Sequence, residues 1–267
     1  MKKTILLFVV ALAFAAMSFA GEGVSVGARA AVSYNDYWGY EDQLDPVLED
    51  SWGVGFAASL DFLIKINSTI AFHPALGFSY RNPSSDVTEG EFMSMFTGAS
   101  ADDYDDYYDD DYYDDDDEYV EKITMTFEQW NLDIPLLLRI NMGRTFAELG
   151  PMLSFNMSSC LLMEAGAGLR SAELEIDLDF NTLEFDLAFG LGHTFVVGGH
   201  NLDLDLRFVL GLTQLFEMKE IVRTMLTMAD LEVGEEELDY AMKELGLDKF
   251  DMPKTWQFQL GLTFWFM

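Results

Sequence analysis

The segment LDLDLRFVLGL, Leu202–Leu212, carries the pattern that decides the fold. Every second residue from Leu202 onward is leucine or phenylalanine, and the residues between them include Asp203, Asp205 and Arg207. Successive side chains of a β-strand point to opposite faces of the sheet, so a period of two predicts a strand with one apolar and one polar face. We therefore expect strands whose two faces meet very different surroundings.

The same period of two recurs along the chain. It is present in five further segments, which are Val24–Tyr34, Trp52–Phe62, Ile70–Arg81, Ala147–Met157 and Trp256–Phe266. In Ile123–Ile140 the apolar residues change phase near Gln129, and in Leu174–Phe195 they change phase near Asn181. We interpret both phase changes as β-bulges. The sequence thus predicts eight strands.

The connections between these strands alternate in length. Three are turns of a few residues, at 65–68, 141–144 and 198–201, and four are long and polar, at 35–51, 82–121, 158–171 and 214–253. Short turns at one end and long loops at the other are typical of outer-membrane barrels, whose short turns face the periplasm. A soluble sandwich or lipocalin-like barrel is the alternative, but it has no reason to separate its loops by length. We predict an all-β fold, an eight-stranded antiparallel up-and-down transmembrane β-barrel with long acidic extracellular loops.

Aromatic residues at both ends of the apolar faces favour the membrane barrel over the soluble alternatives. Those at the long-loop ends are Tyr34, Trp52, Tyr80 and Trp256, and those at the short-turn ends are Phe62, Phe195, Phe264 and Phe266. Such residues form girdles at the two membrane interfaces.

The overall composition excludes several classes of protein. The chain of 267 residues has 15 lysines and arginines against 47 acidic residues, and half of its residues are hydrophobic. A net charge of −32 argues against nucleic acid as a partner, because phosphates require a basic surface. The single cysteine, Cys160, excludes an intramolecular disulfide and a multi-cysteine zinc site.

The first twenty residues have the features of a signal peptide. Lys2 and Lys3 precede an apolar stretch at 4–17, and Ser18 and Ala20 are the small residues that signal peptidase requires. We expect cleavage after residue 20 and export to the outer membrane. The domains expected are a signal peptide at 1–20 and a barrel at 21–267, with an acidic extracellular loop at 82–121 and a helical extracellular loop at 214–253.

Charged residues on the non-apolar faces are expected to point into the barrel. They are Arg29, Arg81, Asp133, Arg139, Glu148, Glu184, Asp186, Asp203, Asp205 and Arg207. Side chains fill the interior of an eight-stranded barrel, and charges held away from bulk water must be paired. We predict a structural network of ion pairs and no open pore. A proton or ion path along these charges is the alternative.

The most unusual segment is DDYDDYYDDDYYDDDDE at 102–118, with eleven aspartates in seventeen residues. Like charges at this density repel one another, so we expect a hydrated, exposed loop. The alternative is weak calcium binding through Asp109, Asp110, Asp111, Asp114, Asp115, Asp116 and Asp117, without the ligand spacing of an EF-hand. Apart from such calcium, we expect no cofactor.

Catalysis has little support in the sequence. His73, His193 and His200 are few and dispersed, and no G-x-S-x-G, P-loop or H-E-x-x-H motif occurs. We expect a protein that is not an enzyme.

One stretch also resembles a known family. WNLDIPLLLRINMGRTFAELGPMLSFNM, Trp130–Met157, is similar to the PorT-like outer-membrane β-barrel domain, in which an Ile-Pro followed by leucines, a tight turn and a Gly-Pro recur. The aromatic last strand, ending at Met267, looks like the signal read by the barrel-assembly machinery. The resemblance implies a barrel of the Gram-negative outer membrane, with membrane lipid and the assembly machinery as its partners during biogenesis.

Three functions remain open from the sequence. The first is a structural role in the envelope, or surface adhesion or ligand binding through the long loops. The second is a PorT-like accessory role in protein secretion, with secretion-machinery proteins as partners. The third is a small-solute channel.

The acidic run generates a first prediction. Replacing 102–118 with a Gly/Ser linker of equal length leaves the barrel folded, because a hydrated loop contributes no core. The measurement is the gel mobility of the refolded protein in SDS with and without boiling. A variant that loses the mobility difference would show instead that the acidic run packs on the barrel.

Overall fold

A computed structural model describes residues 23–39, 51–88, 122–167, 170–177, 183–214 and 253–266, together with 223, 234, 238 and 243. The predicted signal peptide, the acidic run with Asp109–Asp117 and most of the predicted helical loop lie outside these residues. Isolated helical positions are described at Arg223, Leu238 and Lys243. Within the described part of the chain, no helix has both the length and the apolar character needed to cross a membrane.

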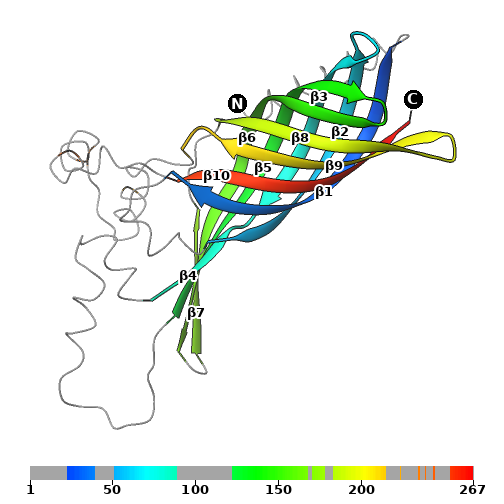
Figure 1. Ribbon diagram of the computed structural model, residues 1–267. Helices are drawn as coiled ribbons and strands as arrows, with labels where there is room; N and C mark the ends of the chain where they lie inside the picture. Colours follow the sequence, from blue (N-terminus) through cyan, green and yellow to red (C-terminus); the bar gives the residue numbers. More distant parts are fainter. Residues whose placement is uncertain are drawn as a thin grey trace, which may run out of the picture.

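Eight antiparallel strands close into a barrel (Figure 1). They are β1 (Val24–Trp38), β2 (Gly53–Lys65), β3 (Ile70–Arg81), β5 (Lys122–Met142), β6 (Thr145–Ala167), β8 (Leu183–Val197), β9 (His200–Gly211) and β10 (Lys254–Trp265). Each strand pairs with the next in this series, and β1 pairs with β10 to close the ring. The predicted fold of an eight-stranded antiparallel barrel is confirmed.

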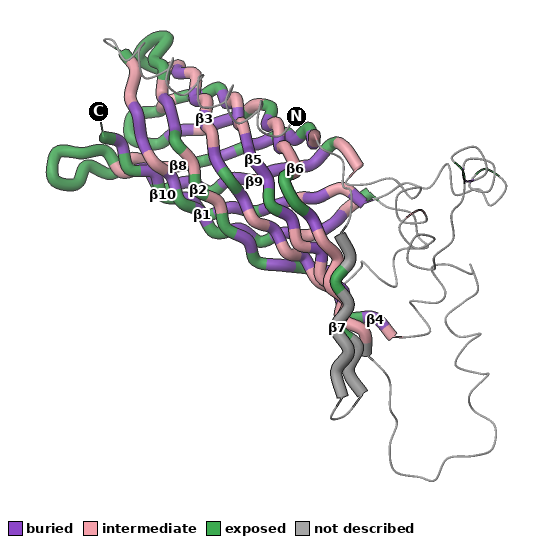
Figure 2. The backbone as a smooth tube through the Cα atoms, turned by 180° about the vertical axis from the view of Figure 1, so that it is seen from behind, coloured by how far each residue is buried: buried purple, intermediate pink, exposed green. Residues whose placement is uncertain are grey.

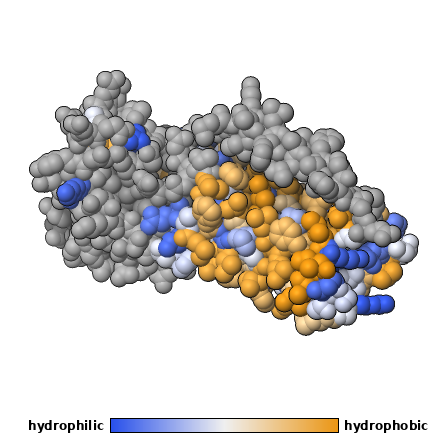
Figure 3. Space-filling view, turned by 90° about the horizontal axis from the view of Figure 1, so that it is seen from above, coloured by the Kyte–Doolittle hydropathy of each residue, from blue (hydrophilic) through white to orange (hydrophobic). Residues whose placement is uncertain are grey.

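The two faces of each strand are distributed as a membrane barrel requires. Buried and exposed residues alternate along the strands (Figure 2), and apolar side chains gather on the outside of the wall (Figure 3). On β9, Leu206 is 48% exposed whereas the neighbouring Asp205 is 4% exposed. This is the inverse of a soluble protein, because the apolar face is outside and the charged face is inside. The arrangement excludes the soluble sandwich, in which a second sheet would cover the apolar face.

The short turns all lie at one end of the barrel. The turn between β8 and β9 is Gly198-Gly199, with φ angles of +60° and +88°. A two-residue turn in which both residues have positive φ twists in the same sense as the two strands that it joins. Glycine adopts a positive φ without steric cost. The two glycines therefore allow β8 and β9 to be joined by a tight hairpin.

The bulge predicted near Gln129 in the segment Ile123–Ile140 is matched by a register shift at Trp130/Asn131, but the extra residue lies in the neighbouring strand. The lumen-facing residues of β5 continue in one phase through Phe127, Gln129 and Asn131, all of them buried. The register shift lies in β6, where Met157 is the extra residue between the pairs formed by Trp130 and Asn131. The apolar residues change phase because they lie on the outer wall in the membrane-spanning part of β5. In the part of β5 that extends beyond the lipid, they face the interior.

Two predicted loop boundaries also need correction. The predicted loop 82–121 begins with a strand, β4 (Ser84–Thr88), which pairs with the start of β5. The predicted loop 158–171 is largely strand, because β6 continues to Ala167 and then pairs with β7 (Arg170–Asp177). The segment Leu174–Phe195, predicted as one bulged strand, is described as parts of β7 and β8, and 178–182 lies outside the described residues.

These corrections define a second feature, which we call the projecting sheet. It consists of β4, the first residues of β5 (122–126), the last residues of β6 (160–167) and β7, paired in that order. In Figures 1 and 2 it extends from the barrel at the end away from the short turns. Since β5 and β6 have 21 and 23 residues, they are about twice as long as the ~9–11 residues that cross a membrane.

The wall generates a second prediction. Replacing the lipid-facing Leu206 with arginine should lower the free energy of unfolding in lipid vesicles by about 2–4 kcal/mol, because a charge then lies in the hydrocarbon layer. The control is Ile66→Arg, in a short turn where the side chain is 63% exposed, and it should change stability little. Denaturant titration measures both. Equal effects of the two substitutions would contradict the assigned membrane position.

Candidate functional site: the charged lumen

The lumen is lined with buried charges. The described strands bring four arginines, seven carboxylates and one histidine into it, namely Arg29, Arg81, Arg139, Arg207, Asp61, Asp133, Glu148, Glu184, Asp186, Asp203, Asp205 and His73. All ten charges expected from the sequence lie here. Asp61 and His73 were not among them, although both occupy polar-face positions of their alternating strands and could have been found by the same rule.

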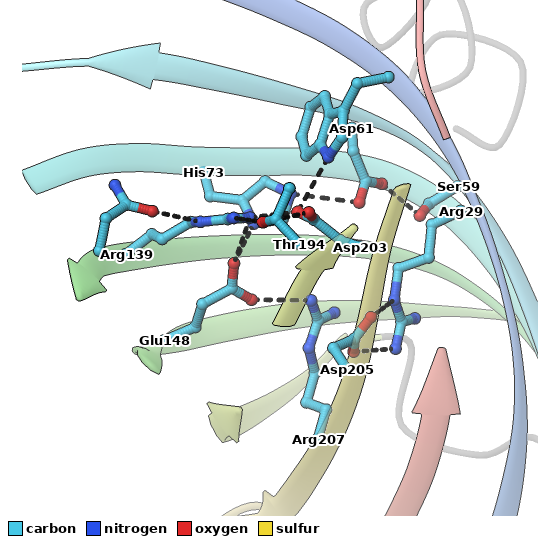
Figure 4. Close-up of polar contacts among 12 residues, drawn as sticks. Arg29, Ser59, Asp61, His73, Arg139, Glu148, Thr194, Asp203, Asp205 and Arg207 are labelled. Atoms are coloured by element: carbon cyan, nitrogen blue, oxygen red, sulfur yellow. Dashed lines mark hydrogen bonds and ion pairs between the residues drawn. The ribbon is translucent and has the colours of Figure 1, made fainter. Parts of the chain in front are cut away.

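The larger group, which we call the inner cluster, lies toward the short turns (Figure 4). It comprises Arg29, Asp61, His73, Arg139, Glu148, Asp203, Asp205 and Arg207. Glu148 on β6 is its centre, because its carboxylate contacts His73 Nδ1 at 2.6 Å, Arg207 Nη2 at 3.2 Å and Arg139 Nη1 at 3.6 Å. One carboxylate thus joins cations from β3, β5 and β9 across the barrel.

His73 is held from both sides. Its Nε2 lies 3.1 Å from Asp61 Oδ2, opposite the contact of Nδ1 with Glu148, and Ser59 Oγ also donates to Asp61. An ionised carboxylate only accepts hydrogen bonds, so both ring nitrogens donate. His73 and the two carboxylates thus form an ion-paired group.

Arg29 makes a two-point ion pair with Asp205. Nη2 and Nε of the guanidinium lie 2.8 and 3.2 Å from the two carboxylate oxygens, and Nη1 donates to Gln259 at 3.3 Å. The guanidinium lies over Gly261, where a Cβ atom would come within 2.6 Å of Cζ. A side chain at this position would have to displace the arginine, which occupies the space next to the glycine.

Arg139 and Asp203 close the network toward the short turns. Their atoms Nη1 and Oδ2 are 2.6 Å apart, and Trp265 Nε1 donates to the same oxygen at 2.9 Å. The guanidinium also stacks on Phe146, 3.5 Å from the ring centre. A cavity of about 300 Å³ opens at this end and is lined by Arg139, Asp203, Trp265, Lys65 and Asn201 among others.

The smaller group, which we call the outer cluster, lies toward the long loops. It comprises Arg81, Asp133, Glu184 and Asp186. Arg81 Nη1 contacts Glu184 at 2.9 Å, and its Nη2 is 3.8 Å from Asp133. Between the two clusters, four neighbouring strands each contribute one buried apolar residue, namely Leu137, Met152, Ala188 and Val209.

The remaining candidates are not brought together. His193 packs against Phe195, and His200 packs against Phe264. Among the residues that the structure describes, no group of three histidine, cysteine or acidic side chains is arranged to hold a metal ion. The aspartates predicted to bind calcium, Asp109–Asp117, lie outside those residues.

A family of outer-membrane proteins matches most of the chain. Residues 15–217 match the model of a protein family described as outer membrane protein beta-barrel domain. Among solved structures, the chain is similar to Neisserial surface protein A, with 10% identity, coverage of 91% of this chain and 96% of that chain, and a TM-score of 0.35. It is also similar to Ail, the attachment invasion locus protein of Yersinia pestis, with 12% identity, coverage of 92% and 100%, and a TM-score of 0.34. No curated protein matches the chain.

The contact between Arg29 and Gly261 generates a third prediction. Gly261→Ala should displace the guanidinium from Asp205 and cost about 1–3 kcal/mol of stability, which is the usual effect of overpacking. The matched control is Gly190→Ala, also in the lumen, where the nearest atom to a new Cβ is 3.5 Å away. That control should be neutral or slightly stabilising. Denaturant unfolding in vesicles measures both variants, and equal stabilities would contradict the packing described.

Proposed function

This chain belongs to the outer membrane protein beta-barrel domain family, and we propose that it is a non-enzymatic surface protein that binds ligands outside the cell. The barrel lies in the Gram-negative outer membrane, and the end that carries the long loops faces the exterior. In this function the barrel is the anchor, and the projecting sheet together with the acidic segments forms the binding part.

The projecting sheet is the observation that carries the proposal. A barrel that only spans the membrane does not need strands about twice as long as the membrane crossing requires, as β5 and β6 are. The sheet is also firmly attached to the barrel. Ser84 on β4 exchanges backbone hydrogen bonds of 2.9 and 3.0 Å with Trp52, which directly precedes β2, and β5 and β6 continue from the barrel into the sheet. A rigid support of this kind favours binding, because less order has to be created on contact.

The lumen supports the role of an anchor. In the inner cluster each charged side chain contacts one of opposite charge. Such a filled interior favours a closed barrel over a solute channel. The histidine held between two carboxylates likewise favours a structural role over catalysis.

The charge of the chain indicates how the ligand would be held. The run 102–118 presents many carboxylate oxygens, which are the ligands that calcium prefers. We propose that Asp109–Asp117 bind calcium weakly and bridge the protein to an anionic polysaccharide. The interleaved tyrosines at 104–113 offer rings that can stack on sugars.

A second candidate is an accessory role in protein secretion, in line with the PorT-like resemblance. The observation that favours it is the cavity of about 300 Å³ at the short-turn end, since this end faces the periplasm. Secretion-machinery proteins that co-purify with the chain, and are lost after substitution of Lys65 or Asn201, would favour this role over surface binding.

The surface-binding proposal generates a fourth prediction. Cells of a Gram-negative host that display the full chain should bind fluorescent alginate in millimolar calcium and release it in chelator. A chain with 102–118 replaced by a Gly/Ser linker should lose this binding. Shortening the projecting hairpin, by replacing 162–175 with Asn-Gly, should reduce it, since Leu161 and Ile176 are paired and a two-residue turn can join them.

The control for this experiment is Ser68→Ala in a periplasmic turn, which should bind as the unchanged chain does. Heat-dependent gel mobility verifies that each variant is folded in the membrane. Equal binding by the unchanged chain, the linker variant and cells without the protein would overturn the proposal.

A further inference from the structure

The outer cluster does not balance its charges. Arg81 is the only cation among the described residues of this cluster, and it faces the three carboxylates of Asp133, Glu184 and Asp186. Glu184 and Asp186 are only 1% and 2% exposed. In the inner cluster, by contrast, three arginines and a histidine face four carboxylates. Burying two uncompensated negative charges is costly, so this cluster requires a further positive partner.

Arg81 directs only part of its hydrogen-bonding capacity at the carboxylates. Its Nη1 donates to Glu184 at 2.9 Å and contacts Thr255 Oγ1 at 3.4 Å, and its Nη2 donates to Ser154 Oγ at 3.3 Å. With the Gln257 amide turned so that its oxygen faces Arg81, that oxygen accepts from Nε at 2.7 Å and from Nη2 at 3.1 Å. Asp186 receives its hydrogen bond from Ser154 at 3.0 Å instead of from the arginine.

The same level of the barrel holds several buried polar atoms without a hydrogen-bond partner in the described structure. One oxygen of each carboxylate is among them, and the others are Ser79 Oγ, Asn131 Nδ2 and both polar atoms of the Gln129 side chain. Gln129 is 1% exposed and pairs in register with Arg81, and Asn131 pairs with Ser79. Buried polar groups in native proteins are almost always satisfied, so unpaired ones at one level indicate something bound there.

We propose that the outer cluster is a proton-binding site, in which the folded barrel keeps the carboxyl group of Glu184 or Asp186 as the neutral acid at neutral pH. A neutral carboxyl group supplies the missing donor, because its O–H can bond to an unpaired oxygen of a neighbouring carboxylate. The same proton removes one of the two excess negative charges. Water bonded to Gln129, Asn131 and Ser79 completes the site.

None of the groups that surround these carboxyl groups exchanges a proton near neutral pH. Arg81 faces them from β3, Ser154 from β6, and Thr255 and Gln257 from β10. Tyr37 on β1 is buried close enough to Glu184 and Arg81 to interact with them electrostatically. Arginine stays charged, tyrosine ordinarily titrates near 10, and the hydroxyl and amide groups do not titrate. The proton is therefore shared between Glu184 and Asp186, the two most deeply buried carboxyl groups of the outer cluster.

Infrared spectroscopy of the full chain, refolded in lipid vesicles at neutral pH with a chelator present, tests the proposal. The unchanged protein should show the carbonyl band of a neutral carboxyl group. Asp186→Asn should lose or weaken this band, because one fewer negative charge then faces Arg81 and the bond between Arg81 and Glu184 remains. The control is Asp205→Asn in the inner cluster, which should keep the band.

The dependence of folding on pH gives a second readout. Each proton kept by the folded state and released on unfolding lowers the folding constant by about tenfold per pH unit as the pH rises. The slope of the unchanged protein should exceed that of Asp186→Asn by about one proton over the neutral range, and Asp205→Asn should keep the full slope. This comparison cancels the carboxyl groups elsewhere in the chain, which are common to all three proteins.

Two results would overturn the proposal. The first is the absence of both the acid band and the extra slope in the unchanged protein, a measurement that stands even if a variant fails to refold. The second is a band that disappears, with a gain in stability, when calcium or magnesium is added to the chelated protein. That result would make the outer cluster a metal site and not a proton site.

Discussion

The pairing of β1 with β10 closes the sheet, and the other features of the molecule depend on that closure. Lipid offers no hydrogen bonds, so a sheet that crosses a membrane must leave no edge unpaired within it. Closure with eight strands gives a lumen that is only wide enough for side chains. The outside must then be apolar and the inside must satisfy its own polar groups, which is the arrangement of Leu206 and Asp205.

The two charge clusters meet this requirement in different ways. Glu148 contacts three cations from three strands, so the inner cluster links these strands across the lumen. Removal of one member leaves others unpaired. The outer cluster places Arg81 among three carboxylates and relies on a partner other than a side chain. The apolar residues Leu137, Met152, Ala188 and Val209 form a group in the lumen on four neighbouring strands. The lumen thus holds a charge-balanced cluster near the periplasm and a cluster with an excess of carboxylates near the exterior.

The strands can be predicted from the sequence because the alternation of side chains between the two faces of a strand depends only on residues adjacent in the chain. The alternation in Leu202–Leu212 identifies both the wall and the lumen, and the same rule places ten of the twelve lumen charges. The same rule is less reliable for a strand that passes from the membrane into the region beyond it. Near Gln129 the apolar face moves from the wall to the interior, and this looks like a bulge from the sequence. The contacts of His73 were beyond reach, because they depend on how the strands are staggered around the barrel.

The projecting sheet also has a mechanical consequence. Strands β5 and β6 run without interruption from the short turn through the membrane and into the sheet, and they are paired along nearly all of this length. A force that pulls the sheet outward along these strands acts on their hydrogen bonds in shear, so that many bonds share the load at once. The neighbouring pairs of β5 with β3 and of β6 with β8 pass the load on around the ring. The barrel therefore resists a pulling force through many hydrogen bonds that are loaded together, and not through the strength of any single bond.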